Sequence, residues 1–303
     1  MTKTESRVLV LLALTANVGI AVMKFIAAAI GGSSAMLAEA FHSVADSGNQ
    51  LFLLRGSTVS RYEASPRHPY GRGKEVFFWS FMVAVFLFVG GAVLSIQQGL
   101  DKLRHPAEPE GLLLSAIVLA LAAGFELGVA YRPAVAEFNR RRGGRTIRAA
   151  VRESKDPTLL VVLFEDSAAV VGLGIAGAGL WLAHVTGNSA WDGAASIVIG
   201  LVLAVTAWTL ALETKSLLVG ESASREDRSA IRAAVLADVE VESIGKLLTM
   251  QLGPDQVLVN LEVEFDDGLS ADTVEMAIDR IEAAVKIAVP TVGPIFIEPE
   301  TRW

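Results

Sequence analysis

The sequence predicts an α-helical membrane protein that ends in a small α+β domain, and three observations support this fold class. The 303-residue chain is 52% hydrophobic and 19% charged, with a mean hydropathy of +0.48, which is far from the composition of a water-soluble globule. Its apolar residues gather in separate stretches before residue 215, and from about Ser216 the chain becomes acidic. We therefore expect a transmembrane domain over residues 1–215 and a second domain over residues 216–303.

Six apolar stretches each have about the 17–25 residues that a helix needs to cross a bilayer. They span residues 8–30, 35–54, 76–96, 112–129, 159–183 and 194–212. The first stretch is too long for the apolar part of a signal peptide, so we expect it to be retained as a helix. The sequence therefore predicts six transmembrane helices.

Basic residues in the short connections predict the orientation of these helices. Five lysines and arginines lie in the link after the second stretch and eight in the link after the fourth, whereas residues 31–34 and 187–193 contain none. Cytoplasmic loops carry the excess of Lys and Arg, so both basic links should be cytoplasmic. We expect a multi-pass protein of the inner or cell membrane with both termini in the cytoplasm.

The acidic C-terminal segment has the pattern of a soluble α+β domain. Residues 221–303 contain 17 acidic and 7 basic side chains, so this segment carries −10 and residues 1–220 carry +3. Hydrophobic periodicity predicts a helix at 225–236, strands at 243–252 and 256–265, a helix at 270–287 and a strand at 294–298. This order suggests a cytoplasmic ferredoxin-like sheet with its helices on one side.

Ionisable residues inside the predicted membrane helices are candidates for function, because burying each one costs roughly 2.5–3.5 kcal/mol on insertion scales. In the second helix, Glu39, His42 and Asp46 lie on one stripe. His42 and Asp46 are an i, i+4 pair, whose side chains can converge on one ion. A structural hydrogen bond between helices is the alternative interpretation of this pair.

The fifth helix adds Glu165 and Asp166, which are adjacent and therefore point about 100° apart. Only one of them can face a single site squarely. If Asp166 faces His42 and Asp46, one imidazole and two carboxylates suit a tetrahedral Zn²⁺. The fourth ligand would then be Glu39, Glu165 or water.

Two further charged residues lie within the predicted helices. Lys24 on the first helix either snorkels towards the membrane surface or pairs with an acid. Glu126 on the fourth helix either forms a salt bridge with the arginines that follow it or takes part in a proton or ion relay.

Several chemistries are excluded by what the sequence lacks. The chain has no cysteine, which excludes disulfides, thiolate metal sites and cysteine nucleophiles. It has neither a His-Glu-x-x-His motif nor a Gly-x-x-x-x-Gly-Lys-Ser/Thr phosphate loop. The net charge of −7 argues against a nucleic-acid partner. We expect a protein that is not an enzyme, holds no tightly bound cofactor and moves a cation by coupling it to protons.

Three segments carry a family resemblance: GGSSAMLAEAFHSVAD at residues 31–46, HPYGRGKE at 68–75 and IFIEP at 295–299. They resemble the cation diffusion facilitators, and residues 156–170 resemble the branch of that family that contains the mitochondrial zinc transporter nine. The resemblance implies a homodimeric, proton-coupled exporter of divalent transition metals. It also implies six membrane helices and a cytoplasmic ferredoxin-like domain that dimerises.

The transport site of that family combines two motifs, each a His or Asp followed four residues later by Asp. His42 and Asp46 match the first motif and Asp166 matches the end of the second, but Val162 stands where the second motif begins. The site is therefore short by one ligand, which Glu165, Glu39 or water must supply.

Zn²⁺ is the transported substrate that the resemblance favours, exported from the cytoplasm against inward protons. Mn²⁺, Fe²⁺ and Co²⁺ are alternative substrates for the same site, because the site contains no soft ligand such as a thiolate. A channel-like or organic-ion carrier and a membrane-anchored interaction protein without transport are the other classes that these polar residues allow.

Two departures from the family concern its additional metal sites. The cytoplasmic domain contains no histidine, whereas the family often builds bridging zinc sites there from histidines. We therefore expect no zinc cluster in that domain and a dimer that does not require metal. In the link between the second and third helices His68 is present, but Arg72 stands at a ligand position, so we expect no site there either.

Overall fold

The computed structural model describes residues 3–106 and 112–300, with side chains described for residues 17–106 and 113–300. Its contacts divide the chain into two compact units. The first unit contains the chain as far as Arg55 together with Trp79–Thr214, and the second contains Gly56–Phe78 and the chain from Lys215 onward. The link between the second and third helices therefore groups with the C-terminal part of the chain.

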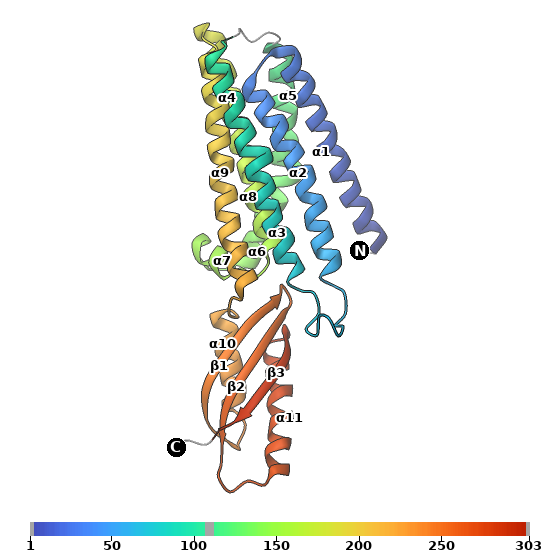
Figure 1. Cartoon of the computed structure of the whole chain (residues 1–303), viewed down its shortest axis with the longest axis vertical. Coiled ribbons are helices and arrows are strands. Elements are labelled where there is room, and N and C mark those ends of the chain that lie inside the picture. Colours follow the sequence, from blue (N-terminus) through green and yellow to red (C-terminus); the bar gives the residue numbers. More distant parts are fainter. Residues whose placement is uncertain (1–2, 107–111, 301–303) are drawn as a thin grey trace. The chain divides into compact units, whose positions relative to one another are not determined.

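The first unit is a bundle whose long helices run side by side (Figure 1). Its helices, some of which extend into the second unit, are α1 (Lys3–Gly31), α2 (Ser34–Val59), α3 (Glu75–Phe86), α4 (Leu94–Arg104), α5 (Leu112–Phe125), α6 (Arg132–Arg142), α7 (Ile147–Glu153), α8 (Pro157–Thr186) and α9 (Ala190–Val219). Two π-helical segments, η1 (Leu87–Val93) and η2 (Glu126–Tyr131), join α3 to α4 and α5 to α6. Each of these pairs is therefore one continuous helical rod.

Among the described residues, four helices are long and apolar enough to cross a membrane, and they correspond to the last four predicted stretches. These are Glu75–Arg104, Leu113–Arg142, Pro157–Thr186 and Ala190–Val219. In α1 the apolar part that could be assessed is the shorter Asn17–Gly31, and in α2 polar residues interrupt the apolar run. The prediction of a helical membrane domain is confirmed, whereas the number of six spans stays a prediction.

The helices extend beyond the predicted stretches, and α6 and α7 were not predicted at all. The Asp156 carboxylate begins α8 by accepting from the backbone N–H groups of Thr158 and Leu159, at 3.1 and 3.3 Å. Thr146 caps α7 in the same way. A hydropathy window finds only the apolar centre of a helix, whereas capping groups and good helix formers such as Arg determine where it ends.

Small residues allow α4 and α9 to pack backbone against backbone. A Cβ on Gly99 of α4 would lie 2.6 Å from the Gly193 carbonyl oxygen of α9, and one on Gly200 would lie 2.9 Å from the Ala92 carbonyl oxygen. Ser196 on α9 also donates to the Ser95 carbonyl at 2.7 Å. Close approach over small residues is a common way for helices to associate within a bilayer.

The second unit contains a three-stranded sheet with two helices on one face (Figure 1). Its elements are α10 (Arg225–Leu236), β1 (Val241–Gly253), β2 (Gln256–Phe265), α11 (Ala271–Ala288) and β3 (Val292–Pro299). The strand order is β1-β2-β3, with β1 antiparallel and β3 parallel to the central β2. The sequence predicted this order of elements and the bounds of β2.

Alternation along β2 builds the core of this unit, as the period-2 pattern predicts. The five odd-numbered residues from Val257 to Phe265 are buried, and they pack with Ile231 and Val235 of α10 and with Ile281 of α11. Arg280 of α11 also forms a two-pronged ion pair with Asp238, with both N···O distances at 2.9 Å. The guanidinium lowers the pKa of the Asp238 carboxyl below its ordinary range. These contacts tie both helices to the sheet.

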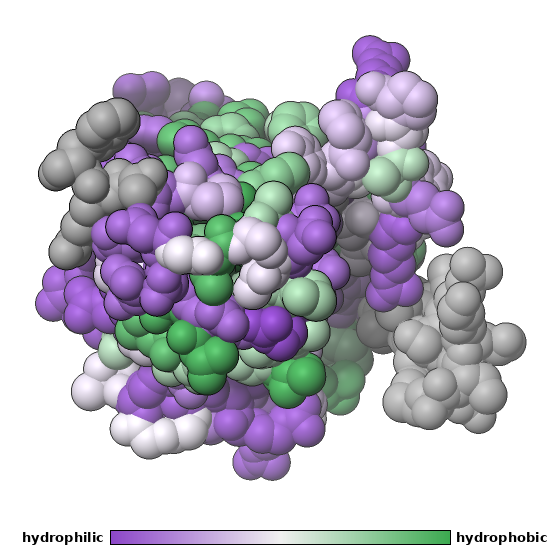
Figure 2. Space-filling view, turned by 90° about the horizontal axis from the view of Figure 1, so that it is seen from below, coloured by the Kyte–Doolittle hydropathy of each residue, from purple (hydrophilic) through white to green (hydrophobic). Residues whose placement is uncertain are grey.

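The surface seen from below mixes hydrophilic residues with smaller hydrophobic patches (Figure 2). In the second unit, the exposed apolar residues include Leu248 on β1 and Phe296 on β3, both on the sheet. Scattered apolar side chains of this kind are normal on a water-exposed surface.

Candidate functional site

A buried histidine and aspartate lie one turn apart on α2. The Nδ1 atom of His42 is 3.3 Å from Oδ1 of Asp46, and the two side chains are 1% and 16% exposed. The i, i+4 spacing explains this proximity, because it places both residues on one face of the helix. The contact does not have the alignment of a hydrogen bond.

Glu165 of α8 is the acid that reaches the polar stripe of α2. Its Oε1 accepts a hydrogen bond of 2.8 Å from Nδ2 of Asn49. Asn49 lies three residues after Asp46, on the same face of α2. The structure therefore places the His42–Asp46 pair of α2 and the Asn49–Glu165 contact between α2 and α8 along one helical face.

Asp166, the adjacent acid, is oriented differently. It is partly buried, and the two groups that act on it electrostatically are Glu126 of η2 and Glu165. Glu126 itself interacts electrostatically with Lys24, Glu165 and Glu39. Asp166 and Glu126 thus add negative charge in the neighbourhood of Glu165.

Glu39 is engaged by a lysine of α1. The ammonium of Lys24 lies 3.0 Å from Oε2 of Glu39 and donates to Oγ of Ser43 at 2.8 Å. Of the two interpretations that the sequence left open for Lys24, the structure shows the pairing with an acid.

Several buried polar atoms in this region have no hydrogen-bond partner within the described residues. They are Nδ1 and Nε2 of His42, Oδ1 of Asp46, Oδ1 of Asn49, Oε1 of Gln50, Oε1 of Glu39 and Oδ2 of Asp166. Buried polar atoms without partners are rare and costly. A group of them around one imidazole and several carboxyl groups is suited to a polar ligand such as a cation.

These side chains form pairs and not a closed coordination cage. In residues 3–106 and 112–300, no group of three or more His, Asp or Glu side chains is close enough to hold a metal ion.

Sequence reasoning missed Asn49 and Ser43. Both lie on α2 with the candidate ligands, and Asn49 is three residues after Asp46 and seven after His42, which is the spacing of one helical face. That spacing could have identified Asn49 from the sequence. No sequence pattern could have identified Ser43, because its role depends on where α1 places Lys24.

A second buried polar group lies at the N-terminal end of α2. The Asp192 carboxylate of α9 accepts from Oγ of Ser33 at 2.5 Å, from the N–H and Oγ of Ser34 at 2.6 and 3.0 Å, and from the N–H of Ala35 at 3.3 Å. Lys102 of α4 donates to the Gly32 carbonyl at 2.8 Å. The beginning of α2 is thus held by both α4 and α9.

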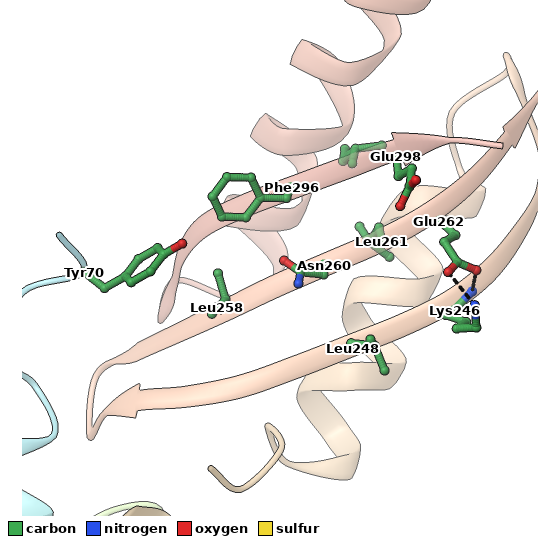
Figure 3. Close-up of a pocket in the computed structure, with 10 residues that line it drawn as sticks. Tyr70, Lys246, Leu248, Leu258, Asn260, Leu261, Glu262, Phe296 and Glu298 are labelled. Carbon is green, nitrogen blue, oxygen red and sulfur yellow. Dashed lines mark hydrogen bonds and ion pairs between the residues drawn. The ribbon is translucent and has the colours of Figure 1, made fainter. Parts of the chain in front are cut away.

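The sheet of the second unit carries a pocket of about 430 Å³ on the face opposite α10 and α11 (Figure 3). Tyr70, Leu258 and Phe296 line its apolar part, while Lys246 pairs with Glu262 at 2.8 Å. The ammonium of Lys246 lowers the pKa of the Glu262 carboxyl. Glu298 also lines the pocket, so one carboxylate remains beyond the Lys246–Glu262 pair.

The link between α2 and α3 contains the two residues considered above as family ligand positions. The backbone of His68 pairs with that of Ser65 in a short bridge. The Arg72 guanidinium lies over the ring of Tyr62, with 5.7 Å to the ring centroid. Arg72 thus makes a cation–π contact within the link.

Comparison with known proteins identifies the family. The cation efflux transmembrane domain family matches residues 10–219. Metal tolerance protein C4 of Arabidopsis thaliana is 34% identical over 237 residues, which cover 77% of this chain and 51% of that protein. The proton-coupled zinc antiporter SLC30A9, mitochondrial, of Homo sapiens is 34% identical over 245 residues, 80% of this chain and 43% of that protein. The manganese efflux system protein MneP of Bacillus subtilis is 21% identical over 268 residues, covering 86% and 85% of the two chains.

The chain spans about half the length of the first two of these relatives. The family match covers well over half of this chain and includes α2 and α8, which carry the candidate site. Members of the family are transporters and not enzymes. The protein is an integral membrane protein with a helical transmembrane domain, and it belongs to the cation efflux family, the cation diffusion facilitators.

Proposed function

We propose that this chain is an antiporter that exports a divalent transition-metal cation, with Zn²⁺ as the favoured substrate, from the cytoplasm in exchange for protons. The observation that carries the proposal is the buried polar group between α2 and α8, in which His42 lies 3.3 Å from Asp46 and Glu165 accepts a hydrogen bond from Asn49 of the same face of α2. A relative 34% identical to this chain bears the name of a proton-coupled zinc antiporter. This name supports Zn²⁺ and protons as the ions that this chain exchanges.

The carboxyl groups give a direct coupling between metal and proton. Asp46 and Glu165 must both be deprotonated to serve as metal ligands. A cation that binds between α2 and α8 therefore displaces the protons that these carboxyl groups carry. When the site faces the other side of the membrane, protons compete for the same oxygens and release the metal.

The proposed ligands are His42, Asp46 and Glu165, with Asp166 or water in the fourth position. Glu165 then supplies the ligand that Val162, at the start of the second family motif, cannot provide. One imidazole with carboxylates suits Zn²⁺, but an oxygen-rich set also accepts harder ions such as Mn²⁺, Fe²⁺ and Co²⁺. The name of MneP, a manganese efflux protein, favours Mn²⁺ as the second candidate substrate.

The proposed architecture follows the sequence analysis. We propose six transmembrane helices in a domain over residues 1–215, both termini in the cytoplasm, and a ferredoxin-like dimerisation domain over residues 216–303 in a homodimer. Alternating access would come from rocking of α2 and α8 against the rest of the bundle.

Metal binding to the purified full chain tests this proposal. At a fixed pH near neutral, we expect saturable binding of Zn²⁺ with release of protons, and a comparison with Mn²⁺, Fe²⁺ and Co²⁺ ranks the substrates. His42→Ala should weaken binding strongly, because it removes the nitrogen ligand. His105→Ala is the matched control, because His105 is also paired with an aspartate one helical turn away, Asp101, but is exposed. Unchanged binding in His42→Ala would contradict the assignment.

A further inference from the structure

Lys24 is a buried cation whose hydrogen-bonding capacity is fully used. It is 3% exposed, and its ammonium contacts Oε2 of Glu39 at 3.0 Å, Oγ of Ser43 at 2.8 Å and the Glu39 carbonyl oxygen at 3.5 Å. An ammonium has three N–H donors. A buried charge is tolerated within a membrane domain when it is paired and hydrogen-bonded in this way.

Glu39 is held from a second side by α8. A Cβ at Gly172 would collide with Oε1 of Glu39, so the absence of a side chain at this position leaves room for the carboxylate. Glu39 itself is completely buried. The carboxylate is therefore confined between Lys24 on α1 and the bare backbone of Gly172 on α8.

Glu39 shares the stripe of α2 that carries the proposed ligands. It lies three residues before His42, which is less than one helical turn. A carboxylate so close to the site would ordinarily be a strong candidate for the fourth ligand. Its charge is neutralised by Lys24, and the same ammonium acts electrostatically on His42 and Asp46.

We propose that Lys24 is a built-in counter-ion that withholds Glu39 from the transported metal. This inference rests on the proposed function, and it selects among the candidates for the missing ligand: Glu165 belongs to the site and Glu39 does not. The fixed positive charge also opposes the charge of a bound divalent cation. Lys24 is thus a specificity-determining residue that acts through Glu39 without binding the metal.

The consequence for transport is a limit on affinity. A site that moves an ion must bind it firmly enough to load and weakly enough to unload. A further carboxylate ligand raises the affinity for a divalent cation, because affinity follows the charge of the ligand set. Because Lys24 is paired with Glu39, the ligand set of the site stays limited to one imidazole and a small number of carboxyl groups.

The test compares Zn²⁺ binding and transport in the full-length chain with and without the lysine. Lys24→Met keeps much of the side-chain length but removes the charge. We expect the Kd for Zn²⁺ to fall by roughly 10- to 100-fold, the range for changes around a metal's ligands, and the maximal flux in proteoliposomes to fall with it. Lys24→Met combined with Glu39→Gln should return the Kd to the parental value, because the released carboxylate is gone.

Lys102→Met is the matched control. Lys102 is also buried, but it donates to the Gly32 carbonyl oxygen, so its removal frees no carboxylate and should not tighten Zn²⁺ binding. Tightening in Lys102→Met equal to that in Lys24→Met would overturn the inference. So would an unchanged or weaker affinity in Lys24→Met.

Glu39→Gln alone keeps the inference testable if Lys24→Met does not fold. We expect its Kd for Zn²⁺ to rise by clearly less than that of Glu165→Gln, because Glu39→Gln removes no ligand and only leaves the charge of Lys24 without its carboxylate partner. A loss of affinity in Glu39→Gln as large as that in Glu165→Gln would show that Glu39 is a ligand and would overturn the inference. If the parental chain binds no divalent metal, the proposed function itself fails, which is a separate result.

Discussion

Asp46→Asn is expected to lower the initial rate of Zn²⁺ transport by on the order of 100-fold, the upper range for disturbing a metal's ligand environment. The substitution removes a buried carboxylate that lies 3.3 Å from His42. It therefore removes both a proposed ligand and one of the groups proposed to exchange metal for protons. The measurement is Zn²⁺ uptake into proteoliposomes that contain the purified variant.

Asp101→Asn provides a matched control for this substitution. Asp101 and His105 are also an i, i+4 pair, with Nδ1 and Oδ1 3.1 Å apart, but their side chains are 71% and 77% exposed. Both substitutions remove one negative charge from a His–Asp pair of one helical turn, but the Asp101 pair is exposed and lies outside the candidate site. Normal transport in Asp46→Asn, or an equal loss in Asp101→Asn, would refute the assignment of the site.

Asp192→Ala is expected to destabilise the protein by about 2–4 kcal/mol, more than a typical helix cap contributes. The Asp192 carboxylate is fully buried and accepts the hydrogen bonds of Ser33, Ser34 and Ala35. Alanine would leave two backbone N–H groups at the beginning of α2 without an acceptor. Thermal unfolding of the detergent-solubilised chain measures the effect.

Asp101→Ala serves as the reference for that measurement, since it removes an exposed carboxylate from the end of α4. Its effect on the unfolding midpoint should be small. Equal midpoints for Asp192→Ala and Asp101→Ala would mean that the cap does not hold α2 in place.

The sequence was sufficient for those parts of the fold that depend on local hydrophobic pattern. Apolar stretches predicted the centres of the membrane helices, and the alternation of Val257 to Phe265 predicted the bounds of β2. The π segments η1 and η2 could not be predicted, because hydrophobic periodicity does not distinguish a short π-helical segment from the α-helix that it continues. The helix α6 is rich in arginine, so a search for apolar spans does not find it.

The site was only partly predictable, for a different physical reason. Spacing along one helix places His42 near Asp46, because both lie on α2. The choice between Glu165 and Asp166 depends on how α8 is rotated about its axis, which is determined by packing against other helices. The pairing of Glu39 with Lys24 likewise depends on contacts between α1 and α2, so the sequence could only offer it as one of two alternatives.

Zinc flux in proteoliposomes under an imposed pH gradient tests the central claim most directly. The account predicts that Zn²⁺ accumulates in the compartment that is initially more acidic, that protons move the opposite way, and that both fluxes are lost together in Asp46→Asn. Zn²⁺ movement that is indifferent to the pH gradient, or that persists without proton counterflow, would contradict antiport through Asp46 and Glu165.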